Sequence, residues 1–233
     1  MTQRIIAINS PFFVKNEEVE TSADLAGKFP VSRPLALEIG CGTGHFITEL
    51  AVANPETNFL AVDIYNKGCL KTCRKIEEAG LDNVMVMRIE ARFLLLNYVD
   101  RESLAGVYIN CPDPWPKKRH RSRRLVNETF LELLLHYLKP EADFYFSTDF
   151  TDYAVQVGEM LPALRGYRNC QNQPVTTELP GYPISKYMQR FLDRGQPIYF
   201  MHYRRQPDVA LAEIPAPDIR AGFRTRWGKV GNE

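Results

Sequence analysis

The sequence predicts an α/β fold built on a doubly wound, mainly parallel sheet. Short apolar runs alternate with segments of helical periodicity, Gly, Asn or Pro separates many of them, and glycine or an acidic residue follows each run at its carboxyl end. Alternation at this spacing is typical of right-handed crossovers between parallel strands. Because such crossovers bring the carboxyl ends of the strands to one edge of the sheet, we expect a ligand site at that edge.

The first half of the chain supplies three of the expected strands. The run 35–40 is short and apolar and ends in glycine, which predicts a buried strand, and 44–53 has helical spacing up to Asn54-Pro55. The same signals predict strands over 58–63 and 83–89, and a helix over 66–79 that ends at Gly80.

The second half supplies the remaining elements. Strands are expected over 106–110 and 144–148, and helices over 124–138, which ends before Pro140, and over 150–164. A weaker alternation over 198–204 predicts a late strand, which we expect to be antiparallel. The expected organisation is an N-terminal extension (1–34), one domain (35–205) and a tail (206–233) that contains Arg220, Arg224, Arg226 and Lys229.

Composition limits the classes of protein that the chain can belong to. Its 233 residues carry a net charge of only +1, so any affinity for nucleic acid must come from local patches. Five cysteines with no Cys-x-x-Cys indicate neither a disulfide framework nor a zinc site. Residues 1–10 do not have the pattern of a signal peptide, and no apolar stretch approaches the roughly 20 residues that span a bilayer. We expect a reduced, cytoplasmic protein that does not contact a membrane.

A glycine loop follows the first expected strand. Gly40, Gly42 and Gly44 permit a tight turn and close approach of a ligand to the backbone. A dinucleotide loop would need its third glycine at position 45, where this chain has a histidine. Glu38 is also unusual beside an anionic pyrophosphate, but it suits a cationic cofactor such as S-adenosylmethionine. Asp63 lies 23 residues after Gly40, close to the usual offset of an acid that binds a ribose.

The most informative stretch is 110–124, which holds three prolines and then a dense basic run. Pro112, Pro114 and Pro116 exclude helix and central strand and hold Asp113 and Trp115 in a stiff loop. Six of the eight residues from 117 to 124 are Lys or Arg. A rigid acid and a large ring beside such a patch suit a site that binds a phosphate backbone and acts on one base. Trp115 either stacks on that base or pins the loop to the core.

These motifs resemble those of known enzymes. The loop from Glu38 to Gly44, with an acid ending the next strand, resembles the cofactor loop of class I S-adenosylmethionine-dependent methyltransferases, which implies a Rossmann-like sheet. The run 112–120 is similar to the signature of the bacterial tRNA (guanine-N7)-methyltransferase family, which methylates a guanine in the variable loop of tRNA. Two later stretches agree, 147–149 and 185–199, and the resemblance covers roughly residues 5–204.

The resemblance implies roles for individual residues. S-adenosylmethionine would be the cofactor, S-adenosylhomocysteine the product and tRNA the partner, with no metal and a monomeric or homodimeric enzyme. The implied cofactor contacts are Glu38, Gly40, Gly42, Gly44, Asp63, Glu90 and Asp113, of which Asp113 is also the catalytic residue. The implied tRNA contacts are Trp115, Lys117, Arg119, Arg121, Asp149, Ser185, Lys186, Tyr187 and Met188. We further expect Lys118, Arg123 and Arg124 to bind phosphates and His120 to make a polar contact.

Two positions depart from the family pattern in their functional groups. Glu90 stands where the family commonly has Asp, and Met188 stands where it has Glu, whereas Ser185 keeps the hydroxyl of the usual Thr. The change at Met188 leaves open a tRNA-binding protein whose catalysis has lapsed, and a methyltransferase with another substrate is a further alternative. A nicotinamide dehydrogenase is disfavoured by His45.

The chemistry expected of a guanine N7 site is simple. N7 carries an in-plane lone pair and no proton, so the attack needs no general base. Catalysis should consist mainly of positioning, with a nearby carboxylate to offset the positive charge that develops on the purine. Asp113 is expected to accept hydrogen bonds from the base, and Asp149 to share that role.

Overall fold

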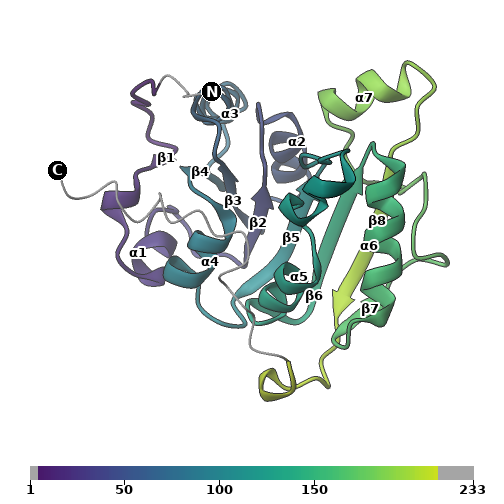
Figure 1. Cartoon of the computed structure of the whole chain (residues 1–233). Helices are drawn as coiled ribbons and strands as arrows, with labels where there is room; N and C mark the ends of the chain where they lie inside the picture. The colour runs from purple at the N-terminus through teal and green to yellow at the C-terminus, as the bar shows by residue number, and fades with distance from the viewer. Residues whose placement is uncertain (1–4, 215–233) are drawn as a thin grey trace. The chain divides into compact units, whose positions relative to one another are not determined.

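The computed structural model describes residues 5–214, which form two compact units, 5–100 and 101–214 (Figure 1). The first unit contains four parallel strands in the order β1-β4-β3-β2. Its strands are β1 (Phe13–Val14), β2 (Leu35–Ile39), β3 (Asn58–Asp63) and β4 (Val84–Arg88). Its helices are α1 (Ser22–Ala26), α2 (His45–Ala53), α3 (Asn66–Glu78) and α4 (Ala91–Tyr98), with the short 3-10 helix η1 (Asn16–Glu18).

The core of the first unit consists of the continuous apolar runs predicted as strands. Leu37, Val62 and Val86 are each 0% exposed, one from each of the three longer strands. Runs that are apolar on both faces are characteristic of parallel strands buried from both sides. The strands predicted at 35–40, 58–63 and 83–89 and the helices at 44–53 and 66–79 are thereby confirmed within a residue or two.

Residues 5–34 belong to the first unit and add structure to it. Strand β1 pairs with β4 at the sheet edge, and Val14, Val19 and Leu25 are buried. Helix α1 begins in a capping box in which Thr21 and Asp24 bind each other's backbone N–H. The N-terminal segment is therefore part of the folded first unit, to which it contributes the edge strand β1 and the helix α1.

The second unit joins parallel and antiparallel strands in the order β5-β6-β8-β7. β5 and β6 are parallel, whereas β8 is antiparallel to both β6 and β7, which confirms the late antiparallel strand. Helix α6 lies along this sheet and packs on β6, β7 and β8 (Figure 1). The strands are β5 (Leu104–Asn110), β6 (Leu138–Thr148), β7 (Tyr167–Asn169) and β8 (Tyr199–Arg205). The helices are α5 (Glu128–Leu135), α6 (Thr151–Ala163) and α7 (Lys186–Leu192), with the 3-10 helices η2 (Lys118–Arg123) and η3 (Leu211–Glu213).

The helix predicted over 124–138 is shorter than expected. It begins after Asn127, whose side chain accepts the N–H of Phe130 over 3.0 Å, and it ends at Leu135. Pro140 therefore lies inside β6 and not between a helix and a strand. The register between β5 and β6 shifts between the pairs at Leu138 and Asp143, and the strand is exposed at Pro140, so its missing N–H is tolerated there.

Two further sequence expectations concern membrane-spanning segments and the C-terminal tail. No helix within residues 5–214 is long and apolar enough to cross a membrane. Of the expected tail 206–233, the structure describes residues 206–214, so the four basic residues expected to mark the tail lie outside the described part.

Candidate functional site

The glycine loop of the first unit leaves open space beside its backbone. Gly40 has φ = 84°, and a Cβ built there would meet no atom within 4 Å. On its other side the loop is packed against α3, where a Cβ on Gly68 would lie 2.3 Å from the carbonyl oxygen of Gly42. The sequence did not single out Gly68, because only the close approach of α3 to the loop reveals its role. The loop is thus fixed from below and open at Gly40, as a ligand cradle requires.

Asp63 holds this loop in place. Its Oδ2 accepts the backbone N–H of Gly42 over 2.8 Å, and its Oδ1 accepts the N–H of Tyr65 over the same distance. Both carboxylate oxygens of Asp63 therefore join the end of β3 to the backbone of the glycine loop and to the start of α3. Glu38 precedes the loop and is 2% exposed, which places a second carboxylate in the interior beside it.

Glu90 is the N-cap of α4. Its Oε2 accepts the N–H groups of Arg92 and Phe93, and its Oε1 accepts the Nε of Arg92 over 2.7 Å. Most of its acceptor capacity is therefore used within the protein. Helix α4 was not predicted, since eight residues give little periodicity and glutamate is not a favoured cap.

The proline loop of the second unit is held in a strained conformation. Cys111 and Trp115 each have φ = 44°, a left-handed conformation that is uncommon outside glycine. These two residues flank Asp113, whose side chain is exposed. Local strain of this kind persists only where the surroundings impose it, and it clusters at functional sites.

Trp115 is packed within the basic segment itself. The guanidinium carbon of Arg123 lies 5.0 Å from the centroid of the Trp115 ring, and the His120 ring meets it edge-on at 5.8 Å. These two contacts hold the Trp115 ring against the basic segment that follows it. Arg123 contacts this ring, and it forms no ion pair with an acidic side chain within residues 5–214.

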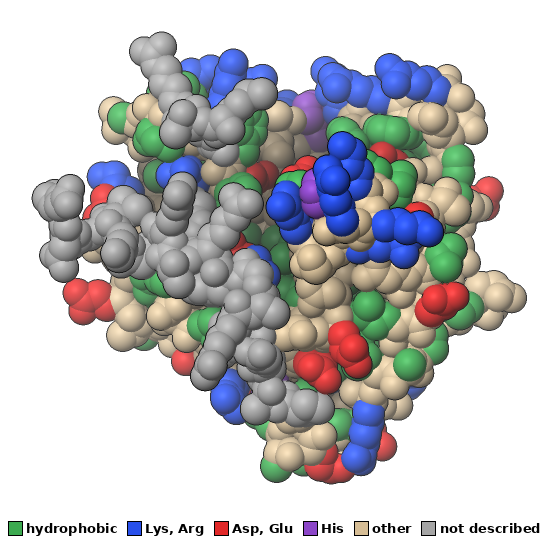
Figure 2. Space-filling view, in the orientation of Figure 1, with side chains coloured by type: hydrophobic (Ala, Val, Ile, Leu, Met, Phe, Trp, Pro, Cys, Tyr) green, Lys and Arg blue, Asp and Glu red, His purple; other side chains and the backbone are tan. Residues whose placement is uncertain are grey.

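The basic segment divides into exposed and structural cations. Lys117, Lys118 and Arg119 are exposed, and Lys, Arg and His side chains gather over η2 on the face shown in Figure 2. Arg121 forms an ion pair with Asp152. The expectation that Arg124 binds phosphate is wrong, because its side chain is 0% exposed and also pairs with Asp152, over 2.7 Å.

Asp149 follows β6 and is partly buried. Its Oδ1 is buried without a hydrogen-bond partner, and burial is the main cause that raises the pKa of this carboxyl. The Tyr187 hydroxyl and the Cys111 thiol lie close enough to oppose that shift. A desolvated carboxylate with an unused acceptor is suited to receive N–H groups from a ligand.

Asn110 is a polar residue at the end of β5 to which the sequence assigned no role. Its Oδ1 accepts hydrogen bonds from the hydroxyls of Ser147 and Tyr182, each over 2.8 Å, and its Nδ2 is buried without a partner. The feature that could have pointed to Asn110 is its position opposite Ser147 in the β5–β6 register, and that position is known only once the strand pairing is known.

Helix α7 carries the segment 185–188. Ser185 is its N-cap and accepts the N–H of Met188 over 3.2 Å, while Lys186 and Tyr187 are exposed. Met188 is 0% exposed and packs with Ile198 and Phe200. The expected contact between Met188 and the tRNA is therefore corrected, because this side chain belongs to an apolar cluster that anchors α7.

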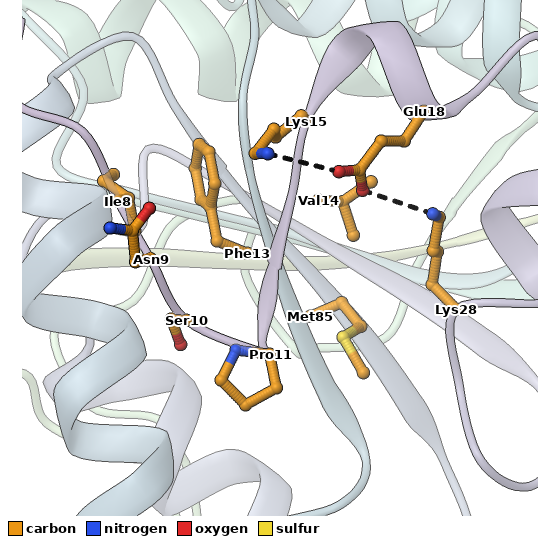
Figure 3. A pocket seen from close by; sticks show the side chains of 10 residues that line it. All are labelled: Ile8, Asn9, Ser10, Pro11, Phe13, Val14, Lys15, Glu18, Lys28 and Met85. Carbon is orange, nitrogen blue, oxygen red and sulfur yellow. Dashed lines mark hydrogen bonds and ion pairs between the residues drawn. The ribbon is translucent and has the colours of Figure 1, made fainter.

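A cavity and a group of potential metal ligands lie away from the predicted site residues. A cavity of about 330 Å³ lies in the N-terminal segment, where Lys15 and Lys28 both pair with Glu18 (Figure 3), and no predicted site residue lines it. Within residues 5–214, one group, Asp143, Cys170 and His202, has ligand atoms close enough together to hold a metal ion. Arg204 donates to the same Asp143 oxygen as His202, over 2.8 Å, and its positive charge disfavours a cation there.

Several solved structures with a similar fold are methyltransferases. The 16S rRNA methyltransferase KamB matches with a TM-score of 0.58 at 15% identity, over 79% of this chain and 92% of that one. The 30S ribosomal A1408 methyltransferase from an uncultured bacterium matches with a TM-score of 0.56 at 14% identity, over 79% and 94%. At this identity the likeness establishes the fold alone, a class I methyltransferase sheet.

Sequence comparison is more specific. A family model described as "Putative methyltransferase" matches residues 32–201. The tRNA (guanine-N(7)-)-methyltransferase of Syntrophotalea carbinolica is 54% identical over 97% of this chain and 98% of that protein. The protein of the same name from Geobacter metallireducens is 51% identical over 89% and 99%. These matches span the glycine loop, the proline loop and α7 alike, and the chain therefore belongs to the tRNA (guanine-N(7)-)-methyltransferase family.

Proposed function

We propose that this chain, as a cytoplasmic monomer or homodimer without a metal ion, transfers a methyl group from S-adenosylmethionine to N7 of a guanine in the variable loop of tRNA. The observation that carries the proposal is the 54% identity, over nearly the whole of both chains, to a relative named for this activity. The geometry of both units supports it independently.

The first unit offers the groups that S-adenosylmethionine requires. The cofactor supplies a methyl group bound to a positively charged sulfur, so the buried Glu38 beside the loop opposes its charge. The open backbone at Gly40 permits close approach, and Asp63 places a carboxylate at the end of β3 beside the loop, where an acid can accept from ribose hydroxyls. Glu90 has one acceptor position left for the adenine amino group.

The second unit offers two carboxylates for the base. Asp113 is exposed within the proline loop, and Asp149 has a buried oxygen without a partner. Guanine presents N1–H and an amino group as donors, and its ring becomes positive as N7 is methylated. Carboxylates that accept from these donors orient the base and stabilise the developing charge, each contact contributing roughly 1.5–3 kcal/mol. No proton has to leave N7, so neither acid needs to act as a base.

Exposed cations on two elements of the second unit suit the tRNA backbone. These exposed cations are Lys117, Lys118 and Arg119 at η2, and Lys186, Arg190 and Arg194 at α7. None of these six residues forms an ion pair with an acid in the described part of the chain. By contrast, Arg165, Arg168 and Arg205 of the same unit are each paired. Unpaired Lys and Arg are the residues that bind phosphates through counterion release.

The observation that motivated the alternative, a tRNA-binding protein without catalysis, no longer supports it. It rested on Met188 as a missing acid in the site, whereas this side chain packs inside an apolar cluster. Asp113 and Asp149, which the chemistry requires, are both present in the second unit.

The test is incubation with labelled S-adenosylmethionine and unmodified tRNA. N7-methylguanine weakens its glycosidic bond, so mild cleavage maps the modified position. We expect label in tRNA and one cleavage site in the variable loop. Label at another atom or in another loop would contradict the finer proposal, and no incorporation at saturating cofactor would contradict the activity.

A further inference from the structure

Arg124 is a buried arginine whose guanidinium donates hydrogen bonds both to the proline loop and to helix α6. Its Nε donates to the carbonyl oxygen of Pro114 over 2.8 Å, and its Nη2 donates to Asp152 over 2.7 Å. Its Nη1 donates to Gln156. The guanidinium carbon also lies 4.6 Å from the centroid of the Tyr153 ring. One planar group therefore ties the loop to three side chains of α6.

The charge of this buried group is neutralised on α6 and not on the loop. Asp152, in the first turn of α6, accepts from Arg124 and from Arg121. The loop contributes only a neutral carbonyl, that of Pro114. Burying a guanidinium is costly unless it is paired and hydrogen-bonded; here it pairs with Asp152, and each of its three nitrogens donates a hydrogen bond.

The bond to Pro114 falls at the centre of the strained segment. Pro114 stands between Asp113 and Trp115, and the left-handed residues Cys111 and Trp115 lie on either side. Such backbone conformations cost free energy and relax when nothing holds them. This hydrogen bond holds the Pro114–Trp115 peptide, one residue after Asp113. Because the ring of Pro114 fixes its φ, the constraint passes to the Asp113–Pro114 peptide and so to the Asp113 backbone.

We propose that Arg124 is a positioning residue for methyl transfer, which holds the Pro114 carbonyl and thereby the orientation of Asp113 toward the guanine. The proposal rests on the proposed function for its effect on turnover. It assigns a role to Arg124 different from that of its basic neighbours: Lys117, Lys118 and Arg119 face solvent, whereas Arg124 acts within the fold. The expected consequence is a loss of kcat rather than of tRNA affinity.

Arg205 provides a matched control. It is also a buried arginine of the second unit, 2% exposed, and it donates to the carbonyl oxygen of Leu138 and to Glu102 over 2.6 Å. Within residues 5–214, none of its hydrogen-bond or ion-pair partners belongs to the proline loop or to α6. Replacing it by lysine removes the same planar group with no direct effect on Asp113.

The experiment compares Arg124→Lys with Arg205→Lys in a Trp227→Phe background, where Trp115 is the one remaining tryptophan. We measure urea unfolding, the affinity for S-adenosylhomocysteine, kcat and KM for tRNA, and acrylamide quenching of Trp115. For Arg124→Lys we expect a fall in kcat of about 10- to 100-fold, little change in KM or cofactor affinity, and stronger quenching. For Arg205→Lys we expect lower stability with kcat and quenching unchanged.

Unchanged kcat and quenching in Arg124→Lys would overturn the proposal, as would equal losses of kcat in both variants. If Arg124→Lys does not fold, Gln156→Ala removes a single acceptor and should give a smaller change of the same kind. Trp115 quenching distinguishes failure of the proposed function from failure of the proposed role of Arg124. If the wild-type protein transfers no methyl group, the proposed function fails. Stronger quenching in Arg124→Lys alone would still show that Arg124 holds the proline loop.

Discussion

The Oδ2 atom of Asp63 accepts the backbone N–H of Gly42 over 2.8 Å, which joins the end of β3 to the glycine loop after β2. The acid that the sequence marks as a ribose ligand is therefore also a support of the loop. Its other oxygen accepts the N–H of Tyr65, the N-cap residue of α3. Substitutions here should affect cofactor binding through the loop as well as through direct contact.

Asp63→Asn is expected to weaken binding of S-adenosylhomocysteine by about tenfold or more. An amide has one acceptor oxygen where the carboxylate has two, so either Gly42 or Tyr65 loses its partner, at a cost of about 1–3 kcal/mol. Isothermal titration calorimetry measures the affinity. Asp82→Asn is the control, because that acid is exposed and pairs with Arg33 at the surface. Equal affinities for wild type and Asp63→Asn would show that Asp63 contributes to neither role.

Gly68→Ala and Gly40→Ala are expected to separate loop support from ligand space. A Cβ on Gly68 would lie 2.3 Å from Gly42, so the loop or α3 must shift, which costs about 1–3 kcal/mol of unfolding free energy. A Cβ on Gly40 meets open space and costs only the left-handed backbone, about 1–2 kcal/mol, but it occupies room beside the ligand. Urea unfolding and cofactor titration should therefore rank the variants in opposite orders. The same order in both would contradict an open cradle at Gly40.

Asp149→Asn is expected to stabilise the fold while lowering methyl transfer. Burial raises the pKa of this carboxyl, so the folded state binds its proton more tightly than the unfolded chain does. The wild-type protein accordingly loses stability as pH rises through the carboxyl range, and the neutral amide removes that loss. A gain of 1 kcal/mol would raise Tm by about 2–4 °C in a chain of this size. Thermal melts at neutral pH should show the gain and melts at acid pH should not; a gain independent of pH would need another cause.

Neutralising Lys117, Lys118 and Arg119 together should flatten the salt dependence of tRNA binding. Each phosphate contact contributes about 0.7–0.9 to the slope of log K against log salt, so the slope should fall by about 2–3. The control replaces Arg165 and Arg168, which already pair with Glu213 and Glu141. A slope that falls equally in both proteins would place the RNA contacts elsewhere.

The strands and the tight turn of the glycine loop were predictable from the sequence because their signals are local. Within the run 58–63, residues 59–62 are apolar and Asp63 follows them, and β3 has the same bounds as the predicted strand. Helix α7 and strand β7 escaped prediction, since seven and three residues are too short to establish a period. Their stability comes from tertiary contacts such as those of Met188.

The roles within the basic run could not be predicted, for a different physical reason. In sequence, Arg124 is one of six cations in eight positions, and nothing local distinguishes it from Arg119. Its partner Asp152 lies 28 residues away, on a helix whose approach only the fold establishes. Long-range pairing of this kind decides which cations face solvent and which hold the loop.

The most direct test of the central claim uses tRNA transcribed with 7-deazaguanine in place of guanine. This base keeps N1–H, O6 and the amino group, but carbon replaces N7, so the proposed nucleophile is absent. We predict that the modified tRNA competes with ordinary tRNA for binding and accepts no methyl group, whereas ordinary tRNA is methylated. Methyl transfer to the 7-deazaguanine tRNA at a comparable rate would contradict the account, because it would show that the chain modifies another atom.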